Sequence, residues 1–311
     1  MQAVWRADAA RLIFNVEFKG VLGMPFTPWM QGGWTRLALA MAGLAMLLGA
    51  AGCAGTGSGQ AQSPVSRQAM TTSAAGRDIV TASDETEMRR RARIRLELAG
   101  AYFGRGQITT ALDEVKQAIA LDGGMSDAYE LRGLIYVAMN EPALAEESYR
   151  RAIQLDARNG SVLHNYAWFL CQRQQYAEAD TYFARAVELP MSVAVPRTLM
   201  ARGVCQMQAG LLPQAQASLK RSYELEPGNP VTAFNLAFLF YSMGDAGAAR
   251  FYIRRVNNLP EQANAESLWL GIRIEHKLGN LSAQDELASQ LRSRFPNTRE
   301  TTALDLGRFD E

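Results

Sequence analysis

The stretch that decides the fold is residues 126–159, which read SDAYELRGLIYVAMNEPALAEESYRRAIQLDARN. Apolar and small residues recur three, four and seven positions apart in each half, which places them on one face of each of two helices. Asn-Glu-Pro at 140–142 separates the halves, and the proline suits the first turn of the second helix. Gly133 and Ala145 are small enough for the two helix axes to approach closely, while Tyr149 fills the volume beside them. The stretch therefore predicts a helical hairpin.

Small residues recur along the chain at the spacing set by Gly133. They are Ala99, Gly133, Ala167, Gly203, Ala237 and Gly271, at intervals of 34, 34, 36, 34 and 34 residues. Twelve residues after each of them comes an alanine: Ala111, Ala145, Ala179, Ala215, Ala249 and Ala283. A period of 34 with small residues at these positions is the signature of the tetratricopeptide repeat, a helix–turn–helix unit that stacks into a solenoid. We therefore expect an all-α, right-handed superhelical solenoid of six repeats over residues 88–297.

Two departures from the period are informative. The interval of 36 places two extra residues between the third and fourth repeats, within residues 190–196. The sixth repeat carries Gln290 where the other repeats have a small or apolar residue, as expected of a terminal repeat with a polar outer face. Residues 298–311 then form a C-terminal tail.

An uncharged apolar run occupies residues 37–51 and ends in Gly52-Cys53. Fifteen residues are short for a membrane span and typical of the core of a signal peptide. The run resembles a bacterial lipobox, in which Cys53 becomes lipidated and forms the mature N-terminus, although Ala50 stands where leucine is usual. Cleavage near Ala51, leaving a soluble periplasmic protein, is the alternative. The resemblance implies anchoring at the outer membrane, because no aspartate follows the cysteine.

The rest of the N-terminal region sets the expected domain boundaries. Residues 1–29 contain Asp8 and Glu17 and fit no signal-peptide plan, so Met30 or Met24 is the expected start. Residues 53–87 are rich in Gly, Ser, Thr, Ala and Gln and predict a flexible tether. The expected organisation is an extension and signal peptide at 1–52, the tether at 53–87, the repeats at 88–297 and the tail at 298–311.

Composition argues against several functional classes. The formal net charge is +1, and the basic run at 89–93, a candidate for lipid head groups or nucleic acid, reads more simply as a solvated helix start. With two histidines, no glycine-rich phosphate loop and no Gly-x-Ser-x-Gly, the sequence offers no metal, cofactor or catalytic motif. We therefore expect a protein-binding module, not an enzyme, with neither a small-molecule substrate nor a nucleic-acid partner.

Two cysteines remain besides Cys53. Cys171 and Cys205 fall on the first helices of repeats three and four, which are neighbours in a solenoid. An oxidising periplasm permits a disulfide between them. The alternative is two buried thiols that act as small hydrophobic residues.

The expected partner-binding groove is the concave face, which the first helices of the repeats line. Its residues lie three positions before, or one or four positions after, the small residues, and Asn165 and Asn235 are expected to be structural instead. The predicted groove residues are Glu130, Leu134, His164, Trp168, Met200, Val204, Phe234, Phe238 and Tyr241. Such an apolar and aromatic surface suits an amphipathic helix or an apolar peptide, with Trp168 and Phe238 as the main contacts. Burial of some of these residues between repeats, or under the tail, is the alternative.

Four stretches go beyond a generic repeat protein. They are 141–147, 164–171, 264–275 and the end of the chain from 295 to 309. Together they resemble the type IV pilus biogenesis and stability lipoproteins, the pilotins of the pilus secretin. The resemblance implies an outer-membrane lipoprotein that helps secretin subunits reach the outer membrane and multimerise. A generic periplasmic scaffold that recruits proteases or cell-wall enzymes is the alternative.

Overall fold

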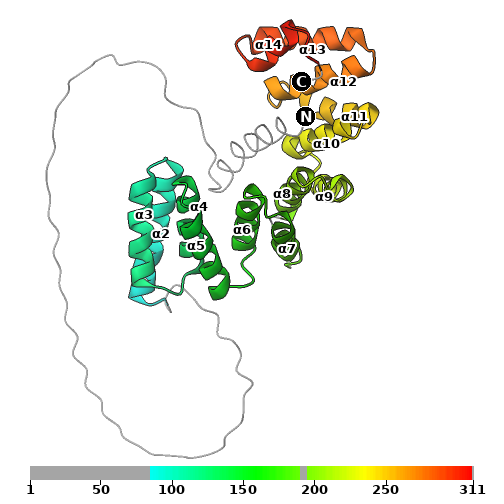
Figure 1. Cartoon of the computed structure of the whole chain (residues 1–311). Coiled ribbons are helices and arrows are strands. Elements are labelled where there is room, and N and C mark those ends of the chain that lie inside the picture. Colours follow the sequence, from blue (N-terminus) through cyan, green and yellow to red (C-terminus); the bar gives the residue numbers. More distant parts are fainter. Residues whose placement is uncertain (1–84, 190–194, 310–311) are drawn as a thin grey trace, which may run out of the picture. The chain divides into compact units, whose positions relative to one another are not determined.

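The computed structural model describes residues 85–189 and 195–309, and within them every regular element is a helix (Figure 1). The helices are α2 (Glu87–Gly104), α3 (Ile108–Leu121), α4 (Ser126–Ala138), α5 (Pro142–Leu155), α6 (Gly160–Gln172), α7 (Tyr176–Val187), α8 (Val195–Gln208), α9 (Leu212–Leu225), α10 (Pro230–Ser242), α11 (Ala246–Asn257), α12 (Ala265–Lys277), α13 (Leu281–Arg294) and α14 (Arg299–Asp305). The expected signal peptide, Cys53, the start at Met24 or Met30 and the tether as far as residue 84 lie outside the described residues. The last residues assigned to the tether lead directly into α2, which is capped by Thr86 and begins at Glu87.

The first twelve of these helices form six hairpins, from α2/α3 to α12/α13. We call the first helix of each hairpin helix A and the second helix B. Each helix A packs against its own helix B and beside the helix A of the next repeat. The predicted all-α array of six repeats is therefore confirmed.

The recurring small residues allow the close contact within each hairpin. A Cβ atom added at Gly203 of α8 would lie 2.6 Å from Cγ of Leu219 in α9, and one added at Gly271 of α12 would lie 3.1 Å from Cδ1 of Leu287 in α13. These distances are shorter than van der Waals contact, so a side chain there would push the helices apart. Ala99 and Ala167 are completely buried in the same way.

The turns inside the hairpins require a left-handed backbone. Gly106, Gly210 and Gly244 occupy three of these turns and have φ of 73°, 77° and 86°. In repeats two and three the same position is filled by Asn140 and Gln174, at φ of 59° and 64°. Glycine adopts this conformation without steric cost, so the two substituted turns are the strained ones.

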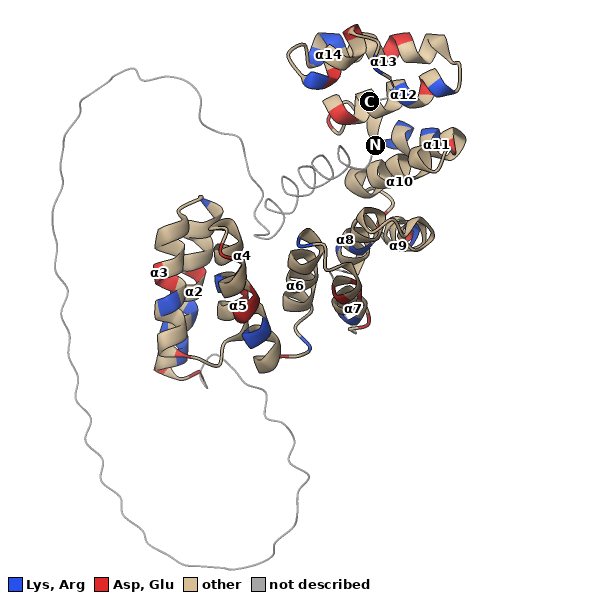
Figure 2. Ribbon diagram, in the orientation of Figure 1, with Lys and Arg blue, Asp and Glu red and all other residues tan. Residues whose placement is uncertain are grey.

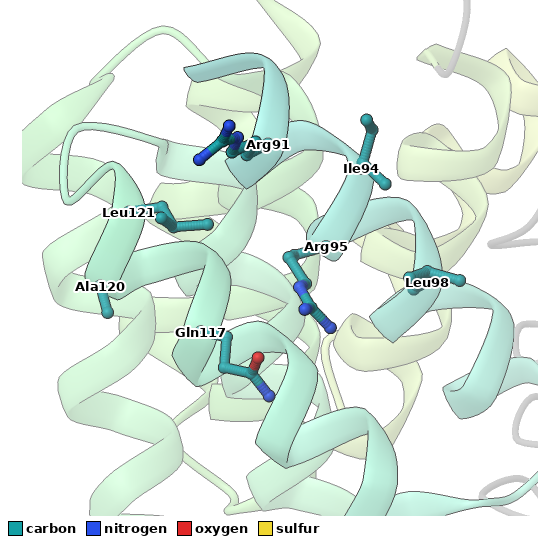
Figure 3. Close-up of a pocket in the computed structure, with 7 residues that line it drawn as sticks. All are labelled: Arg91, Ile94, Arg95, Leu98, Gln117, Ala120 and Leu121. Atoms are coloured by element: carbon teal, nitrogen blue, oxygen red, sulfur yellow. The ribbon is translucent and has the colours of Figure 1, made fainter. Parts of the chain in front are cut away.

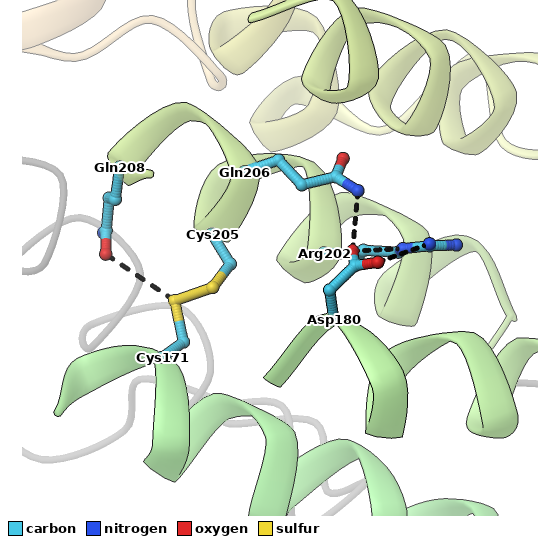
Figure 4. Close-up of a disulfide and its surroundings, with 6 residues drawn as sticks. All are labelled: Cys171, Asp180, Arg202, Cys205, Gln206 and Gln208. Atoms are coloured by element: carbon cyan, nitrogen blue, oxygen red, sulfur yellow. Dashed lines mark hydrogen bonds and ion pairs between the residues drawn. A yellow bond between two sulfur atoms is a disulfide. The ribbon is translucent and has the colours of Figure 1, made fainter. Parts of the chain in front are cut away.

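Repeats three and four are joined by a disulfide between Cys171 of α6 and Cys205 of α8, with Cα atoms 5.9 Å apart (Figure 4). A second link joins α7 to α8, because Asp180 accepts hydrogen bonds from Nε and Nη2 of Arg202 at 2.7 and 2.8 Å. Nε2 of Gln206 donates a further bond to Asp180 at 2.7 Å. These bonds hold the pKa of the Asp180 carboxyl below its ordinary value, chiefly through Arg202. The junction that carries the two-residue insertion is thus fastened on two sides.

The end of the chain is more ordered than a simple tail. Within residues 298–311 the structure places α14, capped by the Thr298 side chain, which accepts from the Thr301 amide. Leu304 is buried against α12 and α13, and Arg292 pairs with Asp305 at 2.8 Å. The short helix thus covers the outer face of the sixth repeat.

Candidate functional site

The structure buries five of the nine predicted groove residues. Their exposed fractions are 8% for Glu130, 3% for His164, 9% for Trp168, 4% for Met200 and 1% for Val204. The reason is that each helix A lies directly beside the next helix A, so positions flanking the small residue are covered by the neighbouring repeat. These five residues therefore hold the array together and do not line an accessible groove, which corrects the expectation from sequence.

Two of these buried residues belong to polar contacts between helices A. Glu130 of α4 accepts hydrogen bonds from Ser161 and Asn165 of α6, and desolvation raises the pKa of its carboxyl. His164 of α6 lies with Nδ1 3.0 Å from Oγ1 of Thr198 in α8. Buried polar groups need such partners, so this set fixes the register of successive repeats.

The remaining predicted groove residues are partly exposed. They are Leu134 of α4 and three aromatic residues of α10, namely Phe234, Phe238 and Tyr241. The rings of Phe234 and Phe238 stack with centroids 6.4 Å apart. Helices α6, α8 and α10 contain no aspartate or glutamate, and the ribbon of α10 carries no charged residue at all (Figure 2). The accessible part of the predicted groove is therefore aromatic and free of negative charge.

A hollow lies on the surface of the first repeat, and the sequence prediction missed it. It has a volume of about 590 Å³, and its lining residues are Arg91, Ile94, Arg95, Leu98, Gln117, Ala120 and Leu121 (Figure 3). We call it the first-repeat hollow. Ile94 and Leu98 remain 46% and 41% exposed, four residues apart on α2. The sequence contained the signal, because these two residues lie on the face of α2 opposite Ala92 and Ala99.

The chemistry of the first-repeat hollow is that of a peptide-binding surface. Four of its lining residues are apolar, and the side chains of Arg91 and Arg95 project from the same helix as Ile94 and Leu98, as Figure 3 shows. Arg95 also pairs with Glu114 at 2.8 Å, which orients it across α2 and α3. Arg91 pairs with Glu87 at 3.1 Å, so both guanidinium groups have carboxylate partners within the first repeat. The apolar area is therefore what the hollow offers to a partner.

Other kinds of site find no support in the described part of the chain. Over residues 85–189 and 195–309, no three His, Cys, Asp or Glu side chains are grouped so as to hold a metal ion. None of the helices described there is both long and apolar enough to cross a membrane.

Comparison with known proteins defines the class first. Residues 126–159 match the family model described as a tetratricopeptide repeat, the same residues from which the repeat is read in the sequence. The helical hairpins and this match make the protein a tetratricopeptide-repeat solenoid.

The likeness extends to particular proteins of that class. The chain is 29% identical over 208 residues to the type IV pilus assembly protein PilF of Pseudomonas aeruginosa, covering 66% of this chain and 81% of that protein. It superposes on PilW, described as a widely conserved type IV pilus biogenesis factor, with a TM-score of 0.63, 30% identity and coverage of 68% of this chain and 97% of PilW. A solved structure of P. aeruginosa PilF gives a TM-score of 0.63, 25% identity and coverage of 71% and 100%. The chain belongs to the PilF/PilW family of tetratricopeptide-repeat proteins of type IV pilus biogenesis.

Proposed function

We propose that this protein is a pilotin, an outer-membrane lipoprotein that brings the secretin subunits of the type IV pilus to the outer membrane and promotes their multimerisation. The observation that carries the proposal is the match to PilF and PilW over 81% and 97% of their own lengths. At 208 residues the match to PilF is about as long as the six repeats together, whereas a generic repeat scaffold needs to share only the consensus. The proposed role is binding and positioning, without catalysis.

The anchor in this proposal is Cys53, carrying lipid chains after removal of the apolar run at 37–51. A single acyl chain gives only marginal membrane binding, so stable anchoring requires the several chains of a bacterial lipoprotein. The tether at 53–87, 35 residues long, would typically reach on the order of 30 Å, at 5–6 Å times the square root of its length. The repeats would then act in the periplasm beside the membrane.

The partner surface that the structure favours is the first-repeat hollow. Monomeric proteins expose few clustered apolar side chains without a binding role, and Ile94 and Leu98 stand there beside two arginines. We propose that an amphipathic or apolar segment of the secretin binds in this hollow. The exposed aromatic residues Phe234 and Phe238 of α10 are the second candidate, because they remain accessible in the predicted groove.

The first experiment tests partner and anchor together. A tagged protein is captured from detergent-solubilised outer membranes, and secretin multimers are detected by gel electrophoresis without heating. We expect secretin multimers in the eluate, and loss of the protein to the soluble periplasmic fraction when Cys53→Ser is introduced. Recovery of proteases or cell-wall enzymes without secretin would favour the generic scaffold, and a Cys53→Ser protein that stays in the membrane with unchanged mass would place the anchor elsewhere.

A further inference from the structure

The last described residues fold back onto helix A of the sixth repeat. Gly307, with φ of 66°, turns the chain after α14, and Phe309 then lies on α12. Its ring stacks on His276 with centroids 4.1 Å apart and planes at 17°, and on Trp269 at 5.8 Å and 26°. Nε of Arg273 donates a hydrogen bond of 2.8 Å to the Phe309 carbonyl oxygen. One aromatic residue of the tail is thus held by two rings and one guanidinium group.

The surface continues from α12 to α10 with the same chemistry. Tyr241 lies under two cations, with Cζ of Arg273 at 5.0 Å and Nζ of Lys277 at 5.2 Å from its ring centroid. We call Tyr241, Trp269, Arg273, His276 and Lys277 the tail-binding surface.

The acidic residues of α10 and α12 do not neutralise this surface. Helix α10 has none, and in α12 Glu266 lies in the first turn. Glu275 is buried and directed to α11, where Nη2 of Arg254 lies 3.3 Å from its carboxylate. The tail-binding surface is therefore both aromatic and cationic, which suits a ligand with an aromatic ring next to carboxylates.

The chain's own sequence at this point has that composition. Asp310 and Glu311 directly follow Phe309. An aromatic residue followed by two acidic residues is complementary to rings flanked by Arg273 and Lys277.

We propose that the tail-binding surface is a second protein-binding site, occupied in cis by Phe309, and that it takes a partner segment in which an aromatic residue precedes acidic residues. The tail is suited to displacement because Phe309 is only half-buried, whereas α14 is fastened separately by buried Leu304 and the Arg292–Asp305 pair. Release of Phe309 therefore leaves the cover of the sixth repeat in place. A site filled in cis binds a partner more weakly, in proportion to the fraction of molecules in which it is free.

The test uses the full-length protein and a fluorescent peptide of residues 306–311, Leu-Gly-Arg-Phe-Asp-Glu. We expect the Phe309→Ala variant to bind this peptide at least about tenfold more tightly than the unaltered protein, because the competing ring is gone. Peptides with alanine in place of phenylalanine, or with Asn-Gln in place of Asp-Glu, should bind at least about tenfold more weakly. Equal binding by both proteins, or no binding by a folded Phe309→Ala variant, would overturn the proposal.

Matched variants locate the binding site. In the Phe309→Ala background, Lys277→Ala should weaken peptide binding severalfold. Lys116→Ala, which changes an exposed side chain of α3, should leave peptide binding unchanged. Equal loss from both lysine variants would mean non-specific attraction and would contradict the proposal. If Phe309→Ala loses helicity, Phe309→Leu keeps apolar volume without ring stacking and gives the same comparison. The assay contains no secretin, so its failure is separate from failure of the pilotin proposal.

Discussion

The first and the sixth repeat differ in how far their apolar side chains are exposed. At the first repeat, Ile94 and Leu98 of α2 are 46% and 41% exposed beside a hollow of about 590 Å³. At the sixth repeat, α14 packs on α12 and α13 with Leu304 only 7% exposed, and Phe309 covers Trp269. A repeat at the end of a solenoid has one face without a neighbour, which must be polar or covered. The last repeat follows that rule, whereas α2 of the first repeat keeps Ile94 and Leu98 exposed.

The difference in exposure between the two end repeats bears on where a partner would bind. An exposed apolar face has a free-energy cost in water that binding removes, so it marks a contact surface. The covered end offers no such face unless its tail is displaced. The first-repeat hollow is therefore an exposed apolar surface, whereas the tail-binding surface is occupied by Phe309 of the same chain.

The largest expected effect on stability comes from removing the disulfide that joins repeats three and four, midway between the two ends. Replacing Cys171 and Cys205 together with serine should lower the free energy of unfolding by about 3–4 kcal/mol for the 34-residue separation in the chain-entropy model, less any native strain. Because a solenoid is stabilised through neighbouring repeats, chemical denaturation of the variant should split into separate transitions for the two halves.

Single-transition unfolding at unchanged stability would mean that the bridge contributes nothing to coupling. Quantitative thiol labelling of the unreduced, denatured protein provides the control: it should find neither Cys171 nor Cys205 free.

The next largest effect compares leucines from the two ends. Leu304→Ala removes a buried side chain under α14 and should cost about 2–4 kcal/mol. Leu98→Ala changes a 41% exposed side chain and should stay within about 0.5 kcal/mol. Urea titration followed by circular dichroism measures both. Similar losses from the two variants would show that the first end is as well covered as the last.

A smaller effect is expected from acid at the junction of the two halves. Because Arg202 holds the pKa of Asp180 below its ordinary value of 3.8, the pair contributes stability above that pH and loses it as pH falls through the lowered pKa. Asp180→Asn should therefore reduce stability at neutral pH and flatten its decline in acid. Thermal melting between pH 2 and 7 measures this change in stability. Its expected size is about 1 kcal/mol or less, as is usual for a partly exposed ion pair. An unchanged acid profile would show that the pair does not fasten the junction.

The sequence predicted the hairpins because their determinants are local and periodic. Gly203 shows this directly, since a Cβ atom there would lie 2.6 Å from Leu219 of the paired helix. Burial of Met200 and Val204 could not be predicted from the same period, because it depends on how closely neighbouring repeats stack. The first-repeat hollow was missed for a related reason: Ile94 and Leu98 look like core residues in the sequence, and only the structure shows that both are exposed. Helix α14 is too short for a periodic signal.

The proposal that the secretin binds in the first-repeat hollow can be tested by substituting exposed leucine and isoleucine residues in the two end repeats. Ile94→Asp combined with Leu98→Asp is compared with Leu281→Asp, which changes a 67% exposed leucine of α13. After matched helical melts, secretin multimers are quantified in outer membranes of cells that express each variant. If the secretin binds in the first-repeat hollow, we expect multimers to fall to the level of a deletion strain with the α2 variant and to remain normal with the α13 variant. Normal multimer levels with a folded α2 variant would contradict it.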